Sequence, residues 1–287
     1  MNSAVKKNNM YKQATIGNTV KLSGIGLHSG ELTTLKFIPA EENTGVIFRR
    51  VDLPGKPEIP AHVSSVINTQ RSTTIGTGSA YIQTVEHILA TLQCLEIDNI
   101  IIEVDAPETP LTDGSGKQFI ETINSAGRVV QDAESEFIEI TEPIAIDSDE
   151  MTLCALPADR YKISYTMAYK HPVVGTQFHS FAINSDTFIN EIGPARTFAT
   201  YNELEQLLKN GLIKGGSLDN AIIVTDQAIL SKEGLRYKDE FVRHKIMDII
   251  GDLSLIGGRI RAHIISLRSG HTYNIKLARA INNFITK

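Results

Sequence analysis

The chain has 287 residues, of which 28 are lysine or arginine and 33 are aspartate or glutamate, so its formal net charge is −5. This mild acidity argues against a general nucleic-acid-binding protein, which needs a basic surface to displace counterions from phosphates. Hydrophobic residues make up 41% and charged residues 21% of the chain, as in an ordinary soluble globular protein. At roughly 150 residues per domain, the length predicts two domains.

The cysteines and the N-terminal segment indicate in which cellular compartment the protein is expected. Cys94 and Cys154 are too few for a disulfide framework or a four-thiolate zinc site. The N-terminal segment has no apolar core of a secretory signal, and no apolar run approaches the ~20 residues that span a bilayer. We therefore expect a cytoplasmic protein without stable membrane insertion.

The first half of the chain alternates predicted strands and helices. Apolar residues in alternating or continuous runs predict strands at 33–37, 45–49 and 99–104. Apolar residues at helical spacing predict a helix over 84–95. A second helix is predicted from about 116 to 126, after a turn at 113–115 and before Gly127.

A polar, acidic segment at 129–136 has no apolar period, and we predict a domain boundary there, between residues 11–132 and 133–287. The second half then predicts strands at 138–146, 152–155, 161–169 and 221–224. Helices are predicted at 202–209 and 240–255, and a final strand and helix follow. Strands followed by helices in each half predict an α+β fold.

The strongest chemical cluster lies on the predicted helix 240–255. His244 and Asp248 are four residues apart, so both lie on one face, at the spacing by which a helix offers two metal ligands. Asp252 follows one turn later and could orient a ligand or a catalytic histidine. The alternative is an ion pair on a solvated face. Apolar residues on the other faces of the helix favour a cleft instead.

Two weaker signals carry the other candidate groups. Glu86 and His87 are adjacent near a helix start, where one could bind a metal and the other take a proton from bound water, or where both could simply be exposed. His271 follows Ser269 and Gly270 in a predicted loop that could present a general acid or could be a surface turn. One histidine and a His–Asp pair from the two halves suit Zn²⁺ with an open position.

Seven motifs occur in an order and at spacings that match one known family: GIGLHSG (24–30), NTGVIFRR (43–50), TVEHILATL (84–92), DNIIIEV (98–104), ARTF (195–198), DEFVRHKIMDIIGDL (239–253) and SGH (269–271). Together they resemble the zinc-dependent UDP-3-O-acyl-N-acetylglucosamine deacetylases (LpxC). The resemblance runs from about residue 11 to the C-terminal helix. It implies a two-domain β-α-α-β sandwich in which the helices of both domains pack between two outer sheets.

The resemblance also implies a catalytic centre. Zn²⁺, one per chain, would be held by His87, His244 and Asp248, with Fe²⁺ as the alternative metal in the cell. The resemblance further implies four catalytic roles. Glu86 would be the general base, and His271 would be the general acid or a positive charge beside the developing oxyanion. Asp252 would orient His271, and Thr197 would donate a hydrogen bond to the oxyanion.

The resemblance places the substrate as well. Lys245 and Arg268 would face the diphosphate, and Tyr169 would stack on the uracil. An insert at about 198–224, beginning at Phe198, would form an apolar passage for the acyl chain. Its implied lining is Leu27 at the mouth, then Tyr201, Leu204, Ile213, Leu218, Ala221 and Ile223. Ordinary core packing is the alternative interpretation of these apolar residues.

The resemblance implies hydrolytic deacetylation of UDP-3-O-acyl-N-acetylglucosamine with water, an early committed step of lipid A biosynthesis. We expect a monomer that binds no nucleic acid. Two rival hypotheses stay open at this point. One is a zinc hydrolase for another amide, such as a peptide, and the other is a non-catalytic sugar-nucleotide-binding module.

Overall fold

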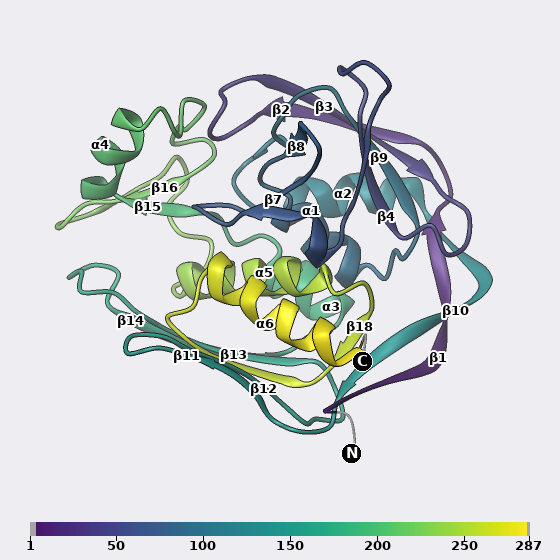
Figure 1. Cartoon of the computed structure of the whole chain (residues 1–287). Coiled ribbons are helices and arrows are strands. Elements are labelled where there is room, and N and C mark those ends of the chain that lie inside the picture. The colour runs from purple at the N-terminus through teal and green to yellow at the C-terminus, as the bar shows by residue number, and fades with distance from the viewer. Residues whose placement is uncertain (1–3, 286–287) are drawn as a thin grey trace.

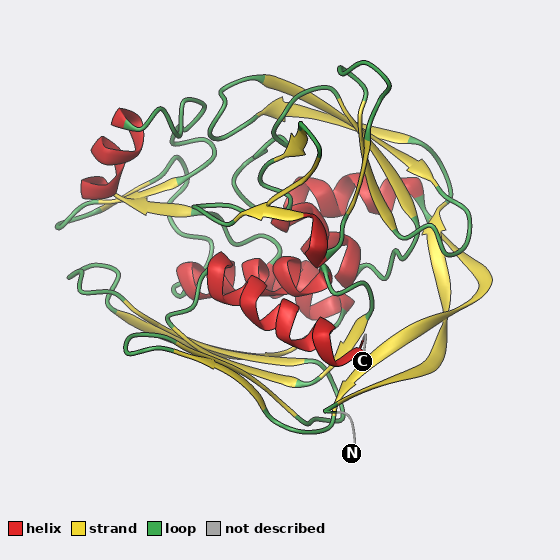
Figure 2. Cartoon of the chain, in the orientation of Figure 1, coloured by secondary structure: helices red, strands yellow, loops and turns green. Residues whose placement is uncertain are grey.

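The computed structural model describes residues 4–285, which form an α+β protein, as predicted (Figures 1 and 2). One five-stranded sheet has the spatial order β2 (Val20–Ile25), β3 (Leu32–Pro39), β9 (Ile100–Val104), β4 (Val46–Arg50) and β5 (Glu58–Pro60). A second five-stranded sheet has the order β11 (Ile144–Asp147), β12 (Thr152–Leu156), β19 (His263–Leu267), β13 (Lys162–Ala168) and β14 (Thr176–Ala182). The strands predicted at 33–37, 45–49, 99–104, 152–155 and 161–169 all lie in these sheets.

The two sheets repeat one topology. The central strands β9 and β19 each pair antiparallel on one side, with β3 or β12, and parallel on the other, with β4 or β13. Each parallel pair is connected through a crossover helix, α1 (Glu86–Cys94) or α5 (Glu240–Ser254), and each central strand leads to a further helix, α2 (Lys117–Ala126) or α6 (His271–Ile285). We call β2 to α2 the N-terminal repeat and β11 to α6 the C-terminal repeat. The sequence shows no internal repeat, so the duplication is visible only in the structure.

In Figure 1 the four helices α1, α2, α5 and α6 lie between the two large sheets. α2 packs on β2, α5 packs on β13 and β14, and α6 packs on β11 and β12, while α1 contacts α5 and α2. The helices predicted at 84–95, 116–126 and 240–255 are confirmed, with ends shifted by one or two residues. Within residues 4–285, no helix combines the length and apolarity needed to cross a bilayer.

A long ribbon joins the two repeats along one side of the molecule (Figure 1). β1 (Val5–Ile16) pairs antiparallel with β10 (Arg128–Ile140), and β10 also pairs with β18 (Arg259–Arg261). The segment 129–136, predicted as a domain boundary, lies inside strand β10. Several of its side chains are exposed, so this stretch of β10 needs no apolar alternation. The strand predicted at 138–146 is interrupted between Ile140 and Ile144, where Pro143 has no N–H to donate to a ladder.

Two small sheets are inserted before the crossover helices. β6 (Val66–Asn68), β7 (Thr74–Thr77) and β8 (Ala80–Ile82) precede α1, after a 3₁₀ turn at Val63–Ser65. Between β14 and α5 lie α3 (Ser185–Thr187), a π turn at Phe188–Ile192, α4 (Tyr201–Lys209), and a sheet of β15 (Phe198–Thr200), β16 (Ile222–Val224) and β17 (Ile229–Leu230). α4 and β16 match the helix predicted at 202–209 and the strand predicted at 221–224. α4 begins at a capping box formed by Thr200 and Glu203.

Candidate metal centre and active site

The two crossover helices approach each other closely where their polar residues lie. A Cβ atom on Gly251 of α5 would lie 2.0 Å from the carbonyl oxygen of Glu86, the first residue of α1. Only glycine therefore permits this contact between the helices. Glu86 and His87 are both buried by it, so the alternative interpretation, an exposed first helical turn, is wrong.

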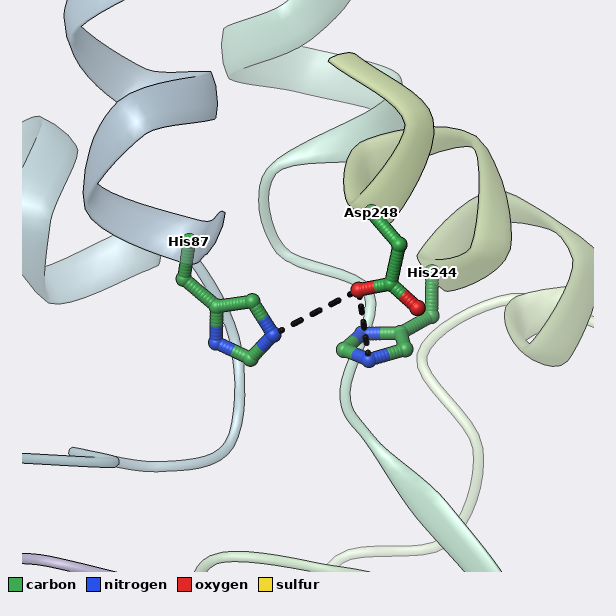
Figure 3. Close-up of side chains that lie close together, drawn as sticks. All are labelled: His87, His244 and Asp248. Carbon is green, nitrogen blue, oxygen red and sulfur yellow. Dashed lines mark ion pairs between the residues drawn. The ribbon is translucent and has the colours of Figure 1, made fainter. Parts of the chain in front are cut away.

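His87, His244 and Asp248 face one another across this contact (Figure 3). Their exposed fractions are 4%, 3% and 2%. The Oδ1 atom of Asp248 lies 3.7 Å from Nε2 of His87 and 3.5 Å from Nε2 of His244. One potential ligand atom from each of the three residues lies within 4.8 Å of the other two. The structure thus brings together, from both repeats, the three residues expected to bind a metal.

The surroundings of the triad favour metal-binding protonation states. Nδ1 of His244 lies 3.1 Å from the carbonyl oxygen of Ala195, to which it can donate, which leaves Nε2 as the free ligand atom. Burial lowers the pKa of His244 to about 3, so its ring is neutral. Burial opposes the charge of Asp248, but the Lys245 ammonium, with Nζ 3.0 Å from Oδ2, and the neighbouring histidines together outweigh it, so the pKa of Asp248 lies well below its ordinary value.

Glu86 lies beside the triad. Burial raises the pKa of its carboxyl group, against the opposing charges of His271 and His87. Its Oε2 atom accepts a hydrogen bond from the backbone N–H of Thr73 at 3.0 Å, and its Oε1 atom lies 4.0 Å from Nε2 of His271. A carboxylate whose pKa is raised toward neutrality is suited to take a proton from water.

His271 is the first residue of α6 rather than part of a loop, which corrects the sequence prediction. Its Nδ1 donates to Oδ2 of Asp252 at 2.8 Å, and Asn274 donates to the same oxygen at 2.8 Å. Burial favours the neutral ring, but the buried Asp252 carboxylate outweighs burial and raises the pKa of His271 to about 9. His271 is therefore protonated at neutral pH and can donate a proton from Nε2.

Thr197 is held at the site by its neighbour in the chain. Arg196 donates to both carboxylate oxygens of Glu240 on α5, from Nε at 2.8 Å and Nη2 at 3.1 Å. Both residues are buried. Because Arg196 lies between Ala195 and Thr197, this ion pair fixes both the carbonyl that orients His244 and the side chain expected to contact the oxyanion.

A pocket of about 620 Å³ opens over these groups. Its walls include Glu86, His271, Thr197 and the three triad residues. Its walls also include most of the predicted substrate-binding residues: Leu27, Tyr169, Phe198, Leu204, Ile213, Leu218, Ala221, Ile223 and Lys245. Two predicted residues are not among its lining. Tyr201 is 62% exposed, and the guanidinium of Arg268 lies 3.8 Å from Glu150.

Several residues around the pocket were not predicted from the sequence. Leu207 and Leu208 continue the lining from α4, and their spacing after Leu204 is a helical signal that could have identified them. Arg71 lines the pocket, with its guanidinium 2.9 Å from Glu203 of α4. No local pattern marks Arg71, because its contact joins segments far apart in the chain.

The donor set fits zinc. Two imidazole nitrogens and one carboxylate oxygen, all buried, converge beside a pocket that leaves room for a further ligand. This is the ligand set of catalytic zinc sites, where the remaining coordination position is left for water or substrate.

Comparison with known proteins agrees with this geometry. The family model described as "LpxC: UDP-3-O-acyl N-acetylglycosamine deacetylase" matches residues 13–283. Proteins named UDP-3-O-acyl-N-acetylglucosamine deacetylase are similar to the chain. The one from Chlamydia caviae is 46% identical over 270 residues, 94% of this chain and 96% of that protein. The one from Citrifermentans bemidjiense is 43% identical over 268 residues, 93% and 88% of the two chains. The chain therefore belongs to the UDP-3-O-acyl N-acetylglycosamine deacetylase family.

Proposed function

We propose that the chain is a zinc-dependent hydrolase that removes the N-acetyl group of UDP-3-O-acyl-N-acetylglucosamine. One observation supports this most directly. The buried triad of His87, His244 and Asp248 adjoins one pocket together with a base, Glu86, and a protonated acid, His271. An amide hydrolase needs such an arrangement, because one group must activate water while another protonates the leaving nitrogen.

The triad would hold Zn²⁺, or Fe²⁺ as the alternative in the cell. When bound, the metal supplies Lewis acidity and lowers the pKa of a water molecule toward ~7. Neutral His244 and ionised Asp248 are already in the protonation states that ligation needs. His87 completes the set from the other repeat, so both crossover helices would have to be in place before the metal binds.

The side chains around the metal then carry the proton transfers. Glu86 accepts a proton from the attacking water, whose oxygen bonds to the carbonyl carbon of the acetyl group. Thr197 donates a hydrogen bond to the developing oxyanion. His271 gives the proton on Nε2 to the amide nitrogen as the C–N bond breaks, and the products are acetate and a free amine. Asp252 keeps His271 oriented through Nδ1.

The walls of the pocket suggest how the substrate is bound. Lys245 offers a cation for the diphosphate, and Tyr169 offers a ring for the uracil. The insert, at about 198–224, supplies an apolar wall for the 3-O-acyl chain, and each buried CH₂ contributes roughly 0.8 kcal/mol. The roles of Arg268 and Tyr201 rest on the family resemblance alone, since neither lines the pocket.

The proposed function also has consequences for the pathway, the cellular compartment, the oligomeric state and the domain organisation. We infer that the reaction is the early committed step of lipid A biosynthesis, that it takes place in the cytoplasm, and that the enzyme acts as a monomer. We also infer that residues 11–132 and 133–287 are its two domains, arranged as the β-α-α-β sandwich. The packing of α1 against α5 between the two large sheets supports that arrangement.

A direct assay tests the function. The purified protein, stripped by a chelator and reloaded with Zn²⁺, should bind about one zinc per chain and release acetate from the UDP-sugar, as expected for a single three-ligand site. Glu86→Gln should keep the zinc and lose most of kcat. Acetylated peptides, assayed in parallel, should not be hydrolysed. Hydrolysis of the peptides alone, or tight UDP-sugar binding by metal-free protein without turnover, would contradict the proposal.

A further inference from the structure

Thr73 lies just before β7, between the carboxylate of Glu86, the proposed base, and that of Asp252, which orients the proposed acid His271. It is fully buried and is not among the pocket-lining residues. Its backbone N–H donates to Oε2 of Glu86 at 3.0 Å. Its hydroxyl donates to Oδ1 of Asp252 at 2.5 Å. Its carbonyl oxygen accepts from the N–H of Val85, directly before α1, at 3.3 Å.

Thr73 thus binds one oxygen of the Glu86 carboxylate and one of the Asp252 carboxylate. The other oxygen of each carboxylate lies toward His271. Glu86, held at Oε2, keeps Oε1 on the side of His271, 4.0 Å from Nε2. Asp252, held at Oδ1, keeps Oδ2 for the Nδ1–H of His271 and for Asn274, both at 2.8 Å. A carboxylate bound at one oxygen only could rotate about its terminal torsion, which has broad minima. The Thr73 hydroxyl removes that freedom from Asp252, which is then held at both oxygens, and the Thr73 backbone N–H holds Glu86 at Oε2.

The contacts of Thr73 also connect three helices. Glu86 belongs to α1, Asp252 to α5, and His271, through Asp252, to α6. The hydroxyl of Thr73 lies 3.4 Å from Nδ1 of His271, farther than Asp252 Oδ2, so the histidine proton points to the carboxylate. The hydroxyl proton is then free for Oδ1 of Asp252. A β-branched side chain suits this place because its χ1 torsion is restricted.

We propose that Thr73 is a positioning residue. It fixes the carboxylate of the general base Glu86 and the Asp252–His271 pair in their positions relative to each other. This inference rests on the proposed function for the roles of Glu86 and His271. Thr73 itself does not reach the pocket, so its effect passes through the two carboxylates. Removing its hydroxyl would leave a buried oxygen of Asp252 without its donor and would release the carboxylate from one of its two constraints.

Thr73→Val tests the proposal, because valine keeps the shape and the backbone N–H and removes only the hydroxyl. We expect kcat to fall by roughly 10- to 100-fold, the equivalent of one hydrogen bond to a buried charge. KM and the zinc content should stay at wild-type values. Thr73→Ser, which keeps the hydroxyl, should restore most of kcat. The matched control is Thr33→Val, since Thr33 is equally buried and its hydroxyl has no partner among the described residues.

A second readout does not depend on turnover. In protein labelled with ¹⁵N-histidine and loaded with zinc, the Nδ1–H signal of His271 reports its hydrogen bond to Asp252, and His271→Gln assigns it. We expect this signal to shift in Thr73→Val and to keep its wild-type position in Thr73→Ser and Thr33→Val. A purely structural role would lower the melting temperature while leaving kcat and this signal unchanged in the folded protein.

The outcomes distinguish a failure of the proposed function from a failure of the role proposed for Thr73. If the wild-type enzyme releases no acetate from the UDP-sugar, the proposed function fails, and the histidine signal still decides whether Thr73 positions Asp252 and His271. If the wild type is active and Thr73→Val retains wild-type kcat and an unshifted signal, Thr73 is not a positioning residue. Should the valine variant not fold, Thr73→Cys replaces it, and a wild-type kcat in that weaker donor overturns the proposal.

Discussion

The N-terminal and C-terminal repeats share their strand order and their crossover helices, yet they contribute differently to the site. The N-terminal repeat supplies one triad residue, His87, and the proposed base, Glu86, both from the first turn of α1. The C-terminal repeat supplies His244, Asp248 and Asp252 along α5, and His271 at the start of α6. The two repeats share one fold, and the residues of the candidate site lie at the contact between them.

The inserts before the crossover helices also contribute different residues to the site. The N-terminal insert, β6 to β8, brings Thr73 against the acid–base groups. The C-terminal insert brings Thr197 and most of the apolar wall of the pocket. In the proposed mechanism the N-terminal insert therefore orients the proton-transfer groups through Thr73, whereas the C-terminal insert supplies most of the apolar wall and the oxyanion contact of Thr197. Because the triad draws on both repeats, neither repeat alone can hold a metal with three ligands.

The largest effect should come from breaking the shared triad from either side. His87→Ala removes the ligand of the N-terminal repeat, and His244→Ala removes one from the C-terminal repeat. We expect each to lower zinc affinity and kcat by more than about 100-fold, because loss of an outer partner alone costs 10- to 100-fold. Metal analysis after dialysis, together with acetate release, measures both. A variant that keeps one zinc per chain would remove that histidine from the ligand set.

The next effect concerns the anchoring of the C-terminal insert. Glu240→Gln breaks the buried pair with Arg196, and losing one partner of such a pair costs about 3–5 kcal/mol of stability. Urea unfolding should show this loss, and kcat should also fall, because Ala195 and Thr197 flank Arg196. Glu205→Gln, in the exposed pair with Lys209, is the control and should leave the urea midpoint unchanged. Equal stability of the two variants would show that the buried pair does not hold the insert in place.

The third effect should appear in the pH dependence. Against the effect of burial, the carboxylates around His271, Asp252 above all, raise its pKa to about 9, so the alkaline fall in kcat/KM of the wild type should come as the pH rises through about 9. In Asp252→Asn that fall should move toward the ordinary histidine value of ~6.5. Overlapping pH–rate profiles of the two proteins would show that Asp252 does not govern the proton on His271.

The same pKa shift predicts a change in stability. A histidine whose folded pKa is raised contributes stability that is complete below its unfolded pKa of ~6.5 and is lost as the pH rises through its folded pKa of about 9. Asp252→Asn should therefore lower the urea midpoint more at pH 6 than at pH 10. A difference of the opposite sign would contradict the assigned protonation state.

Periodicity alone identified the parts of the site that lie on one helix. The spacing of His244 and Asp248 placed two side chains on one face of α5, and the buried surroundings of that helix in the structure agree. His87 lies 157 residues earlier in the chain (244 − 87), and nothing local connects it to them. Residue types alone allowed a ligand set with one histidine from the first half, and the family resemblance assigned His87 to it before the structure showed the contact.

Other features had no local signal at all. No strand was predicted at 129–136, because the side chains there follow no apolar alternation. The partner strand β1, which pairs with this segment, lies more than a hundred residues away in sequence. Nothing in the sequence around Thr73 distinguishes it from other threonines, because its contacts are with Glu86 of α1 and Asp252 of α5. Elements that depend on their own periodicity were predictable, whereas those that depend on a distant partner were not.

The smallest effect concerns the apolar wall of the C-terminal insert. Ala221 lines the pocket beside β16, and Ala221→Leu should fill part of the space proposed for the acyl chain. Each CH₂ that is excluded should lower kcat/KM about fourfold, the equivalent of ~0.8 kcal/mol. Long acyl chains should lose more than short ones, which a series of substrates of graded length measures. Leu230→Ser, on β17 and outside the pocket lining, is the control. A uniform loss across all chain lengths would mean that Ala221 does not face the acyl chain, and that the two inserts do not divide proton transfer from substrate binding in this way.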